Sequence, residues 1–203
     1  MKRAALFFLL FVLFHAASLD AQYAAGILAG PNLSTQSIDA NDVSYSMGLG
    51  YQLGFFARWE SENYDIQPEL YFSQQNAAVQ FEDQTLYSRF RYLMIPLLFR
   101  YHLNENFRLM AGPQLGILLC ARSNFHPVTR EPYREQVYST AYRGSDFSFG
   151  LGAGWEAGNG LIVDLKYNLG LTDISNYEGV PATRNRFLEL RIAYLFLMKE
   201  GEE

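Results

Sequence analysis

Residues 147–156 read "FSFGLGAGWE", and this segment decides the fold of the chain. Its odd positions, from Phe147 to Trp155, are hydrophobic, whereas its even positions, from Ser148 to Glu156, are small or polar. Strict alternation of this kind predicts a β-strand with one apolar face and one face made mainly of glycine. The solvent that surrounds each of these two faces determines the class of protein.

The same alternation recurs along the chain. It is clear in five further segments, at residues 45–59, 64–75, 107–119, 161–172 and 188–196. Residues 23–32 form a weaker first strand, which brings the count to eight with residues 86–101. In residues 86–101 both faces carry apolar side chains, so we expect a bulge or register change near Pro96.

The connections between these strands alternate in length. The long ones cover residues 33–43, 76–85, 121–144 and 173–183, and the short ones cover residues 60–63, 102–105 and 158–159. Antiparallel strands joined in this way place all short turns at one end of a barrel and all long loops at the other. The "GNG" of residues 158–160 fits a tight hairpin turn, which needs a positive φ.

The apolar face must look outward. A lumen enclosed by eight strands is only wide enough for side chains to fill, so the many aromatic and leucine side chains of that face would not fit inside. Glycine in a crowded interior leaves room for long charged neighbours, whereas an apolar outer wall suits lipid. The sequence therefore predicts an all-β protein, an eight-stranded antiparallel up-and-down transmembrane β-barrel.

The first 21 residues are predicted to be a cleaved signal peptide. Lys2 and Arg3 precede an apolar run over residues 4–14, which is far shorter than a spanning helix, and small residues follow it. Residues 22–203 are then the barrel domain, in the bacterial outer membrane with long loops extracellular and short turns periplasmic. The only cysteine is Cys120, which excludes an internal disulfide and makes a lipid anchor after the signal improbable.

Two sets of wall residues are candidates for structural roles. Opposite charges share the inner face and can pair into a polar network, at Arg58, Asp65, Glu69, Arg108, Asp164, Lys166, Glu189 and Arg191. Aromatic residues near the turn-side strand ends can form a lipid-interface girdle, at Trp59, Tyr64, Trp155, Tyr194 and Phe196. Tyr45 and Tyr71 are expected nearer the loop side.

Several segments resemble the PorT-like outer-membrane β-barrel family. They are "IQPELYFSQQ" (66–75), "YLMIPLLFRYH" (92–102), "AGPQLGILL" (111–119), "VDLKYNLGLTDI" (163–174) and "NRFLELRIAYLF" (185–196). The resemblance spans almost all of residues 22–203, in order. It implies the architecture of small OmpA- and OmpX-type barrels and assembly by the barrel-assembly machinery, and it implies no particular activity.

An interaction role is the first functional hypothesis. The loop over residues 121–144 combines arginine and tyrosine, which favour contact surfaces, at Arg122, Arg130, Tyr133, Arg134, Tyr138 and Arg143. Arginine suits the phosphates of lipopolysaccharide, and a surface or secretion protein is the other candidate partner beside membrane lipid. From residue 22 onward 14 basic and 20 acidic residues give a net charge of −6, which disfavours nucleic acid.

Two alternatives remain open, a lipid-modifying enzyme (a deacylase or acyltransferase) and a narrow channel. The enzyme would need a nucleophile and a base at the loop end, where His126 has Ser123 and Ser145 as nearby candidates. No "GxSxG" segment links them, and the sequence has no CxxC, HExxH or P-loop. We therefore predict no catalytic residues, no cofactor and no metal.

Overall fold

The computed structural model describes residues 22–38, 44–81, 84–127, 136–137, 139–176 and 182–199. Eight long strands and one short strand account for most of them, with a 3-10 turn η1 at Ser139–Ala141. The strands are β1 (Gln22–Ile38), β2 (Ser44–Glu60), β3 (Tyr64–Phe81), β4 (Gln84–His102), β5 (Phe107–Pro127), β6 (Gln136–Val137), β7 (Ser145–Glu156), β8 (Leu161–Gly170) and β9 (Thr183–Lys199). No described helix has the length and apolar character to cross a membrane.

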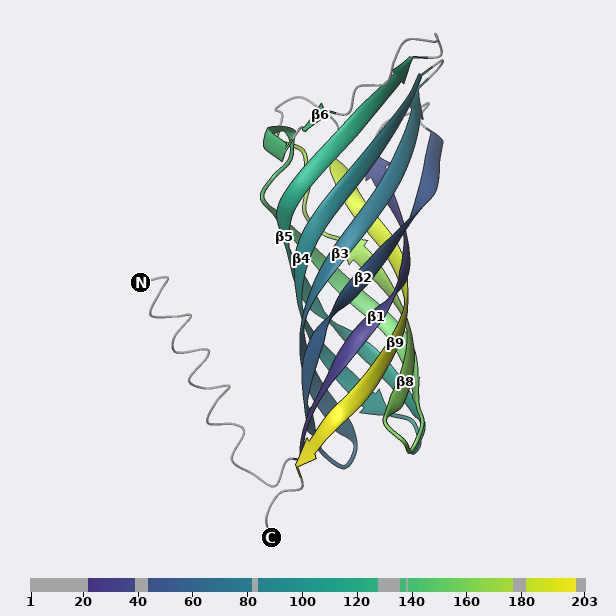
Figure 1. The fold of residues 1–203 in the computed structure, drawn as a ribbon, viewed down its shortest axis with the longest axis vertical. Coiled ribbons are helices and arrows are strands. Elements are labelled where there is room, and N and C mark those ends of the chain that lie inside the picture. Colours follow the sequence, from purple (N-terminus) through teal and green to yellow (C-terminus); the bar gives the residue numbers. More distant parts are fainter. Residues whose placement is uncertain are drawn as a thin grey trace, which may run out of the picture.

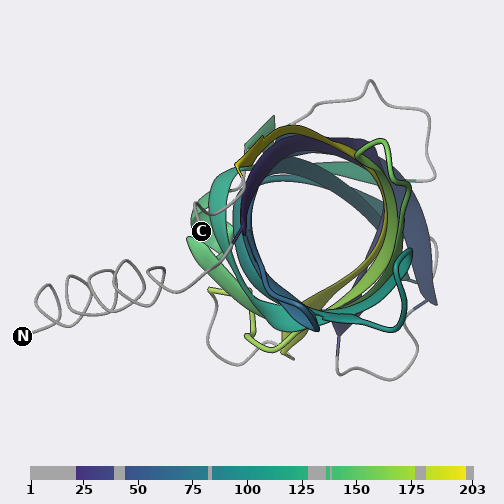
Figure 2. The same ribbon diagram turned by 90° about the horizontal axis from the view of Figure 1, so that it is seen from below.

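The long strands close into a barrel (Figures 1 and 2). Every long strand pairs antiparallel with both neighbours, in the order β4-β3-β2-β1-β9-β8-β7-β5, and a further β4–β5 pairing closes the ring. The predicted eight-stranded up-and-down barrel is therefore confirmed. One end of the barrel, at the bottom of Figure 1, holds three tight connections, the start of β1 and the end of β9. We call it the turn end. We call the opposite end the loop end.

Side chains alternate between lumen and exterior as the sequence predicts. In β7 the outward positions, such as Phe147 and Leu151, are half exposed, while Ser148 and Gly150 between them are buried. Large apolar side chains are strongly exposed on the outside, at 69% for Met47 and 64% for Phe55. An outer wall of this kind suits lipid, because ring closure satisfies the backbone groups without water.

Glycine has a distinct use at two positions. A Cβ on Gly154, which faces the lumen, would collide with the side chains of Asp164 and Arg100, so glycine makes room there for two charged neighbours. Gly160 has a φ of 85° and ends the β7–β8 turn, where its N–H donates to the Ala157 carbonyl. This confirms the predicted tight turn, which needs a residue that tolerates positive φ.

Most strands are longer than predicted, and β1 and β9 extend into predicted loops, to Ile38 and from Thr183. β3 continues to Phe81 and β4 begins at Gln84, so residues 82–83 replace the long loop expected over residues 76–85. β5 continues to Pro127, so the predicted loop start, with Arg122 and His126, belongs to a strand instead. The strict alternation of long and short links was therefore wrong at the β3–β4 connection.

The expected register change near Pro96 was misplaced. Pairing of β4 with β5 shifts where Arg91 faces Cys120 and Tyr92 faces Leu118, so β5 carries the extra residue. Around Pro96 the alternation of β4 is unbroken, and its even positions point into the lumen throughout. Beyond the bulge the inward face of β5 changes from even to odd positions, because one inserted residue inverts the side-chain order.

Candidate functional site: a charged network across the lumen

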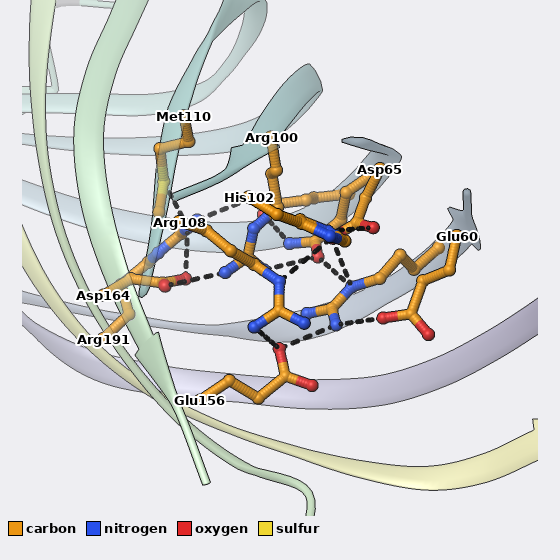
Figure 3. A network of polar contacts seen from close by, with 12 residues as sticks. Glu60, Asp65, Arg100, His102, Arg108, Met110, Glu156, Asp164 and Arg191 are labelled. Carbon is orange, nitrogen blue, oxygen red and sulfur yellow. Dashed lines mark hydrogen bonds and ion pairs between the residues drawn. The ribbon is translucent and has the colours of Figure 1, made fainter. Parts of the chain in front are cut away.

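At the turn end, four buried or partly buried charged groups gather around Arg58. They are Glu60, Asp65, Arg108 and Glu156, which Figure 3 shows close together. Its Nη1 lies 2.9 Å from Glu60 Oε1 and 2.8 Å from Glu156 Oε2. Arg108 also reaches Glu156, at 3.3 Å, and lies 3.4 Å from Asp65 Oδ2. Arginine suits this shared arrangement because its planar fork can contact two carboxylates at once.

A second layer lies deeper in the lumen and depends on Arg191. Its Nη1 is 2.7 Å from Glu69 Oε2, and its Nη2 is 2.8 Å from Asp164 Oδ2. Arg100 approaches the other oxygen of Asp164, at 3.2 Å, and donates to Gln67 Oε1 at 2.8 Å. The two guanidinium groups therefore share one carboxylate, and Gln67 connects this layer with Arg58, which donates to the same oxygen.

A third layer centres on Lys166 and Glu189, whose charged atoms are 3.0 Å apart. Tyr71 donates to Glu189 Oε1 at 2.8 Å, and Lys166 Nζ lies 5.3 Å from the centre of the Tyr71 ring. Gln114 accepts from Lys166 and donates to Asn168, which extends the layer from β8 past β7 to β5. Each charge in this layer therefore has both an opposite charge and a polar neighbour.

These contacts join strands on different sides of the barrel. Around the ring, β2 and β7 lie four strands apart in either direction, so the Arg58–Glu156 pair spans the full lumen. The Arg191–Glu69 pair joins β9 to β3 across two intervening strands. A row of such contacts fills the cross-section with paired side chains, as an eight-stranded lumen permits.

The register of β8 and β9 accounts for two of these ion pairs. Asp164 stands directly opposite Arg191 in the β8–β9 ladder, and Lys166 stands opposite Glu189. All four occupy inward positions, and oppositely charged cross-strand pairs stabilise a sheet. The register therefore aligns two ion pairs before any contact across the lumen forms.

The described lumen side chains include five cations and seven carboxylates, and two of the carboxylates, Glu60 and Asp146, lie outside the most buried part of the network. That part holds five cations and five carboxylates, at Arg58, Arg100, Arg108, Lys166, Arg191, Asp65, Glu69, Glu156, Asp164 and Glu189. Each is at most 8% exposed. Buried charges persist only when they are paired, and removal of one partner leaves an uncompensated charge that costs about 3–5 kcal/mol.

The loop-end half of the lumen combines uncharged polar side chains with one aromatic cluster. Phe90 stacks on Tyr92 with ring centres 6.2 Å apart, and Tyr142 meets Phe90 edge-on at 4.8 Å. Tyr142 also forms a backbone bridge with Ser175, and the adjacent Ile174 is fully buried. Two connecting segments, residues 139–144 and 171–176, therefore pack together over the aromatic cluster, and we call them the cap.

The cap carries one perturbed carboxylate outside the strands. Asp173 Oδ1 accepts the N–H groups of Thr183 at 2.9 Å and Ser175 at 3.0 Å, and its other oxygen lies 3.9 Å from Arg143. These contacts, the Thr183 N–H foremost, hold the pKa of the Asp173 carboxyl below its ordinary value. The charged form of Asp173 therefore favours the ordered cap.

Sequence reasoning missed several members of the network. All eight proposed lumen residues lie in it, but Arg100, Gln67 and Gln114 were not assigned. Tyr71 is 1% exposed inside the lumen, which contradicts its expected place among outer aromatics. His102, which was expected in a turn, ends β4 and lies 2.7 Å from Asp65. The alternation of inward and outward positions along each strand was the one signal in the sequence that could have identified these side chains.

The predicted interface aromatics lie on the outer wall near the turn end. Tyr64, Trp155, Tyr194 and Phe196 are exposed, and Trp59 is half-buried beside Tyr23. Three residues at the same level were not predicted, Tyr23, Tyr101 and Phe107. The side chain of Tyr45 lies outside the described part.

The candidate catalytic residues do not converge in the described region. Ser123 faces the lumen, where its hydroxyl lies 3.1 Å from that of Ser88. Ser145 pairs with Ile117, nine residues before His126 on β5, which corresponds to roughly 30 Å along the strand. Among the described residues, no group of three or more His, Cys, Asp or Glu could hold a metal ion.

The predicted partner loop is only partly described. Arg122 lies on the outward face of β5, and Arg143 lies in the cap with an exposed side chain. The other members, Arg130, Tyr133, Arg134 and Tyr138, lie outside the described residues.

The closed ring, the apolar outer wall and the charged lumen define a transmembrane β-barrel. A family model described as "Outer membrane protein beta-barrel domain" matches residues 16–176. The chain belongs to this family, and its site of action is the bacterial outer membrane.

Several solved structures are similar to this chain at low sequence identity. The attachment invasion locus protein Ail of Yersinia pestis is 14% identical with a TM-score of 0.51, over 88% of this chain and 100% of that chain. Neisserial surface protein A is 11% identical with a TM-score of 0.47, over 85% and 97% of the chains. OprG of Pseudomonas aeruginosa is 13% identical with a TM-score of 0.38, over 87% and 95%. No curated protein matches the sequence.

Proposed function

We propose that this protein is a non-conducting outer-membrane barrel with an architectural and surface-interaction role, without catalytic activity. The observation that carries the proposal is the ion-pair network, because Arg58–Glu156 and Arg191–Glu69 join distant strands across the lumen. An eight-stranded lumen is only wide enough for side chains, so paired side chains that fill it leave no room for a continuous water path. The cap supports the same reading, since Tyr142 packs on the aromatic cluster at the loop end.

In this proposal residues 1–21 are a cleaved signal peptide, and the loop end faces the cell exterior. The protein is a PorT-like member of its family, and the barrel-assembly machinery inserts it. The basic and aromatic residues of the β5–β7 connection provide the contact surface for lipopolysaccharide or for a surface or secretion protein. Arginine and tyrosine are the residue types that favour such contacts.

Planar-bilayer recording tests the occluded lumen. Purified wild-type protein is expected to give a flat current trace, whereas Arg191→Ala/Glu69→Ala, which removes one contact across the lumen, is expected to admit ions. The double variant Arg184→Gln/Arg186→Gln is the control, because it removes two charges from the outer wall and none from the lumen or the cap. Regular conductance steps from the wild-type barrel would contradict the proposal and favour a narrow channel.

A further inference from the structure

The charges on the outer wall are distributed unevenly between the two ends of the barrel. Among the described side chains of the eight long strands, no carboxylate faces outward, since those of β2, β3, β7, β8 and β9 all lie on the lumen side. Five arginines do face outward, and all of them lie in the loop-end half, at Arg89, Arg91, Arg122, Arg184 and Arg186. The outer wall is therefore basic toward the loop end.

Three of these arginines form one cluster on β4 and β5. Arg89 stands directly opposite Arg122 in the ladder, and the inward neighbours Ser88 and Ser123 meet inside the wall. Arg91 lies two positions along β4 on the same face, roughly 7 Å away along the strand. Side chains directly opposite each other in a ladder lie close together, so one phosphate group is small enough to contact both guanidinium groups.

The cluster begins where the apolar wall ends. Leu93 and Ile117, one step closer to the turn end, face outward as a cross-strand pair, and Leu119 beside the bulge is 54% exposed. On the adjacent β3, the partners of Arg91 and Arg89 are the uncharged Gln74 and Asn76. Polar side chains thus replace apolar ones at one level on three neighbouring strands.

The height of the cluster matches a membrane boundary. Tyr101 is exposed on the outer face at the turn end of β4, ten residues from Arg91. Ten residues span roughly 33 Å along a strand, and a tilt of about 40° reduces this to about 25 Å along the barrel axis. The apolar band of an outer-membrane barrel is also about 25 Å tall, which places the arginines at the opposite edge of the hydrocarbon layer.

We propose that Arg89, Arg91 and Arg122 form a binding site for the phosphate groups of a lipid A-type glycolipid in the outer leaflet. Arginine at this depth can lie along the apolar wall with its aliphatic stem and present the guanidinium to a lipid phosphate in a two-point contact. The lipid would be held against the β4–β5 wall, below the cap. The site rests on the proposed orientation, with the loop end in the outer leaflet.

Cys120 provides a built-in probe for this site. It is the only cysteine in the sequence, is partly exposed, and stands opposite Arg91 in the ladder. We would measure the rate at which maleimide alkylates Cys120 in detergent micelles while diphosphoryl lipid A is added. Dephosphorylated lipid A and phosphatidylglycerol serve as the comparison lipids. Micelles expose both ends of the barrel, so this measurement does not depend on orientation in a cell.

Diphosphoryl lipid A is expected to protect Cys120, and Arg89→Gln/Arg91→Gln is expected to weaken protection by tenfold or more, on the order of two interfacial arginines. Arg184→Gln/Arg186→Gln on β9 is the matched control, with the same charge change on another part of the loop-end wall. It should stay within about twofold of wild type. A heat-induced gel shift verifies that each variant is folded.

Three results would overturn the site. They are equal loss of protection in both double variants, no loss in Arg89→Gln/Arg91→Gln, and equal protection of the wild type by either comparison lipid. The first would indicate a general charge effect, and the last would remove lipid A phosphate as the ligand. Failure here leaves the conductance test untouched, because the lumen network and the outer cluster share no residue.

Discussion

Substitution of Arg191 by methionine tests the energetic role of the lumen network most directly. The Arg191 guanidinium is 1% exposed and joins Glu69, at 2.7 Å, to Asp164, at 2.8 Å. In Arg191→Met, Asp164 keeps Arg100 at 3.2 Å, whereas Glu69 keeps only the Gln67 amide at 2.8 Å. Glu69 therefore becomes a buried carboxylate without a cation, and we expect a loss of about 3–5 kcal/mol in the free energy of unfolding.

The double variant Arg191→Met/Glu69→Gln separates pairing from packing. It removes the Glu69 charge that Arg191→Met leaves unpaired. The free energy of unfolding should therefore be higher than that of Arg191→Met by about 2 kcal/mol or more. Urea unfolding in detergent, followed by the fluorescence of Trp59 and Trp155, gives these free energies. The double variant remains measurable even where Arg191→Met alone fails to fold.

Arg143→Met is the matched control for that cycle. Its side chain is 55% exposed, its partner Asp173 is 28% exposed, and the pair is 3.9 Å apart. An exposed ion pair contributes about 0–1 kcal/mol, so this variant should unfold close to wild type. The reasoning is refuted if Arg191→Met costs less than about 1 kcal/mol, or if the effects of Arg191→Met and Glu69→Gln simply add.

Three further outcomes follow from local contacts. Gly154→Val should destabilise the barrel by about 2 kcal/mol or more in urea unfolding, because its Cβ would meet the Asp164 carboxylate. The lowered pKa of Asp173 means that its contribution is complete above the unfolded-state pKa and is lost as the pH falls through the folded-state pKa. Protease resistance of the cap should therefore decrease with acid in wild type and be independent of pH in Asp173→Asn. Tyr142→Ala should raise cap proteolysis at neutral pH, since it removes the contact with the aromatic cluster.

Alternation of apolar and polar residues predicts which face of a strand points outward wherever the outer side chains are apolar and the inner ones are charged or small. In β7 from Phe147, in β8, and in β9 from Leu188, the outer face is uniformly apolar, so both the face and the approximate strand are visible from the sequence. The contrast disappears beyond the apolar band. Residues 76–81 of β3 continue the strand, but the pattern no longer separates an apolar face from a polar one there. Hydrophobicity therefore marks the end of the apolar band and not the end of the strand.

In β4 the sequence pattern fails because the inward face is also apolar. Phe90, Tyr92, Met94 and Leu98 all point into the lumen, which is apolar at those positions, while Leu97 and Phe99 face outward. Both faces are then hydrophobic, and the sequence pattern gives no direction. The bulge of β5 falls in the apolar run at residues 117–121, where an inserted residue leaves no change in polarity to detect. Arg100 was missed because its strand had no assigned face.

Partners across the lumen are a different kind of information. The alternation predicts that Arg58, Glu69 and Arg191 face inward, but the pairing of Arg58 with Glu156 depends on ring closure, which sets β2 opposite β7. The same alternation identifies the outward arginines, once the β5 bulge is known to turn Arg122 to the same face as Arg89. The extension of β5 to Pro127 takes Arg122 out of the predicted partner loop, and the inserted residue turns its side chain to the outer wall. Strand length and strand face are therefore two separate pieces of information, and the sequence pattern at residues 117–123 reveals neither.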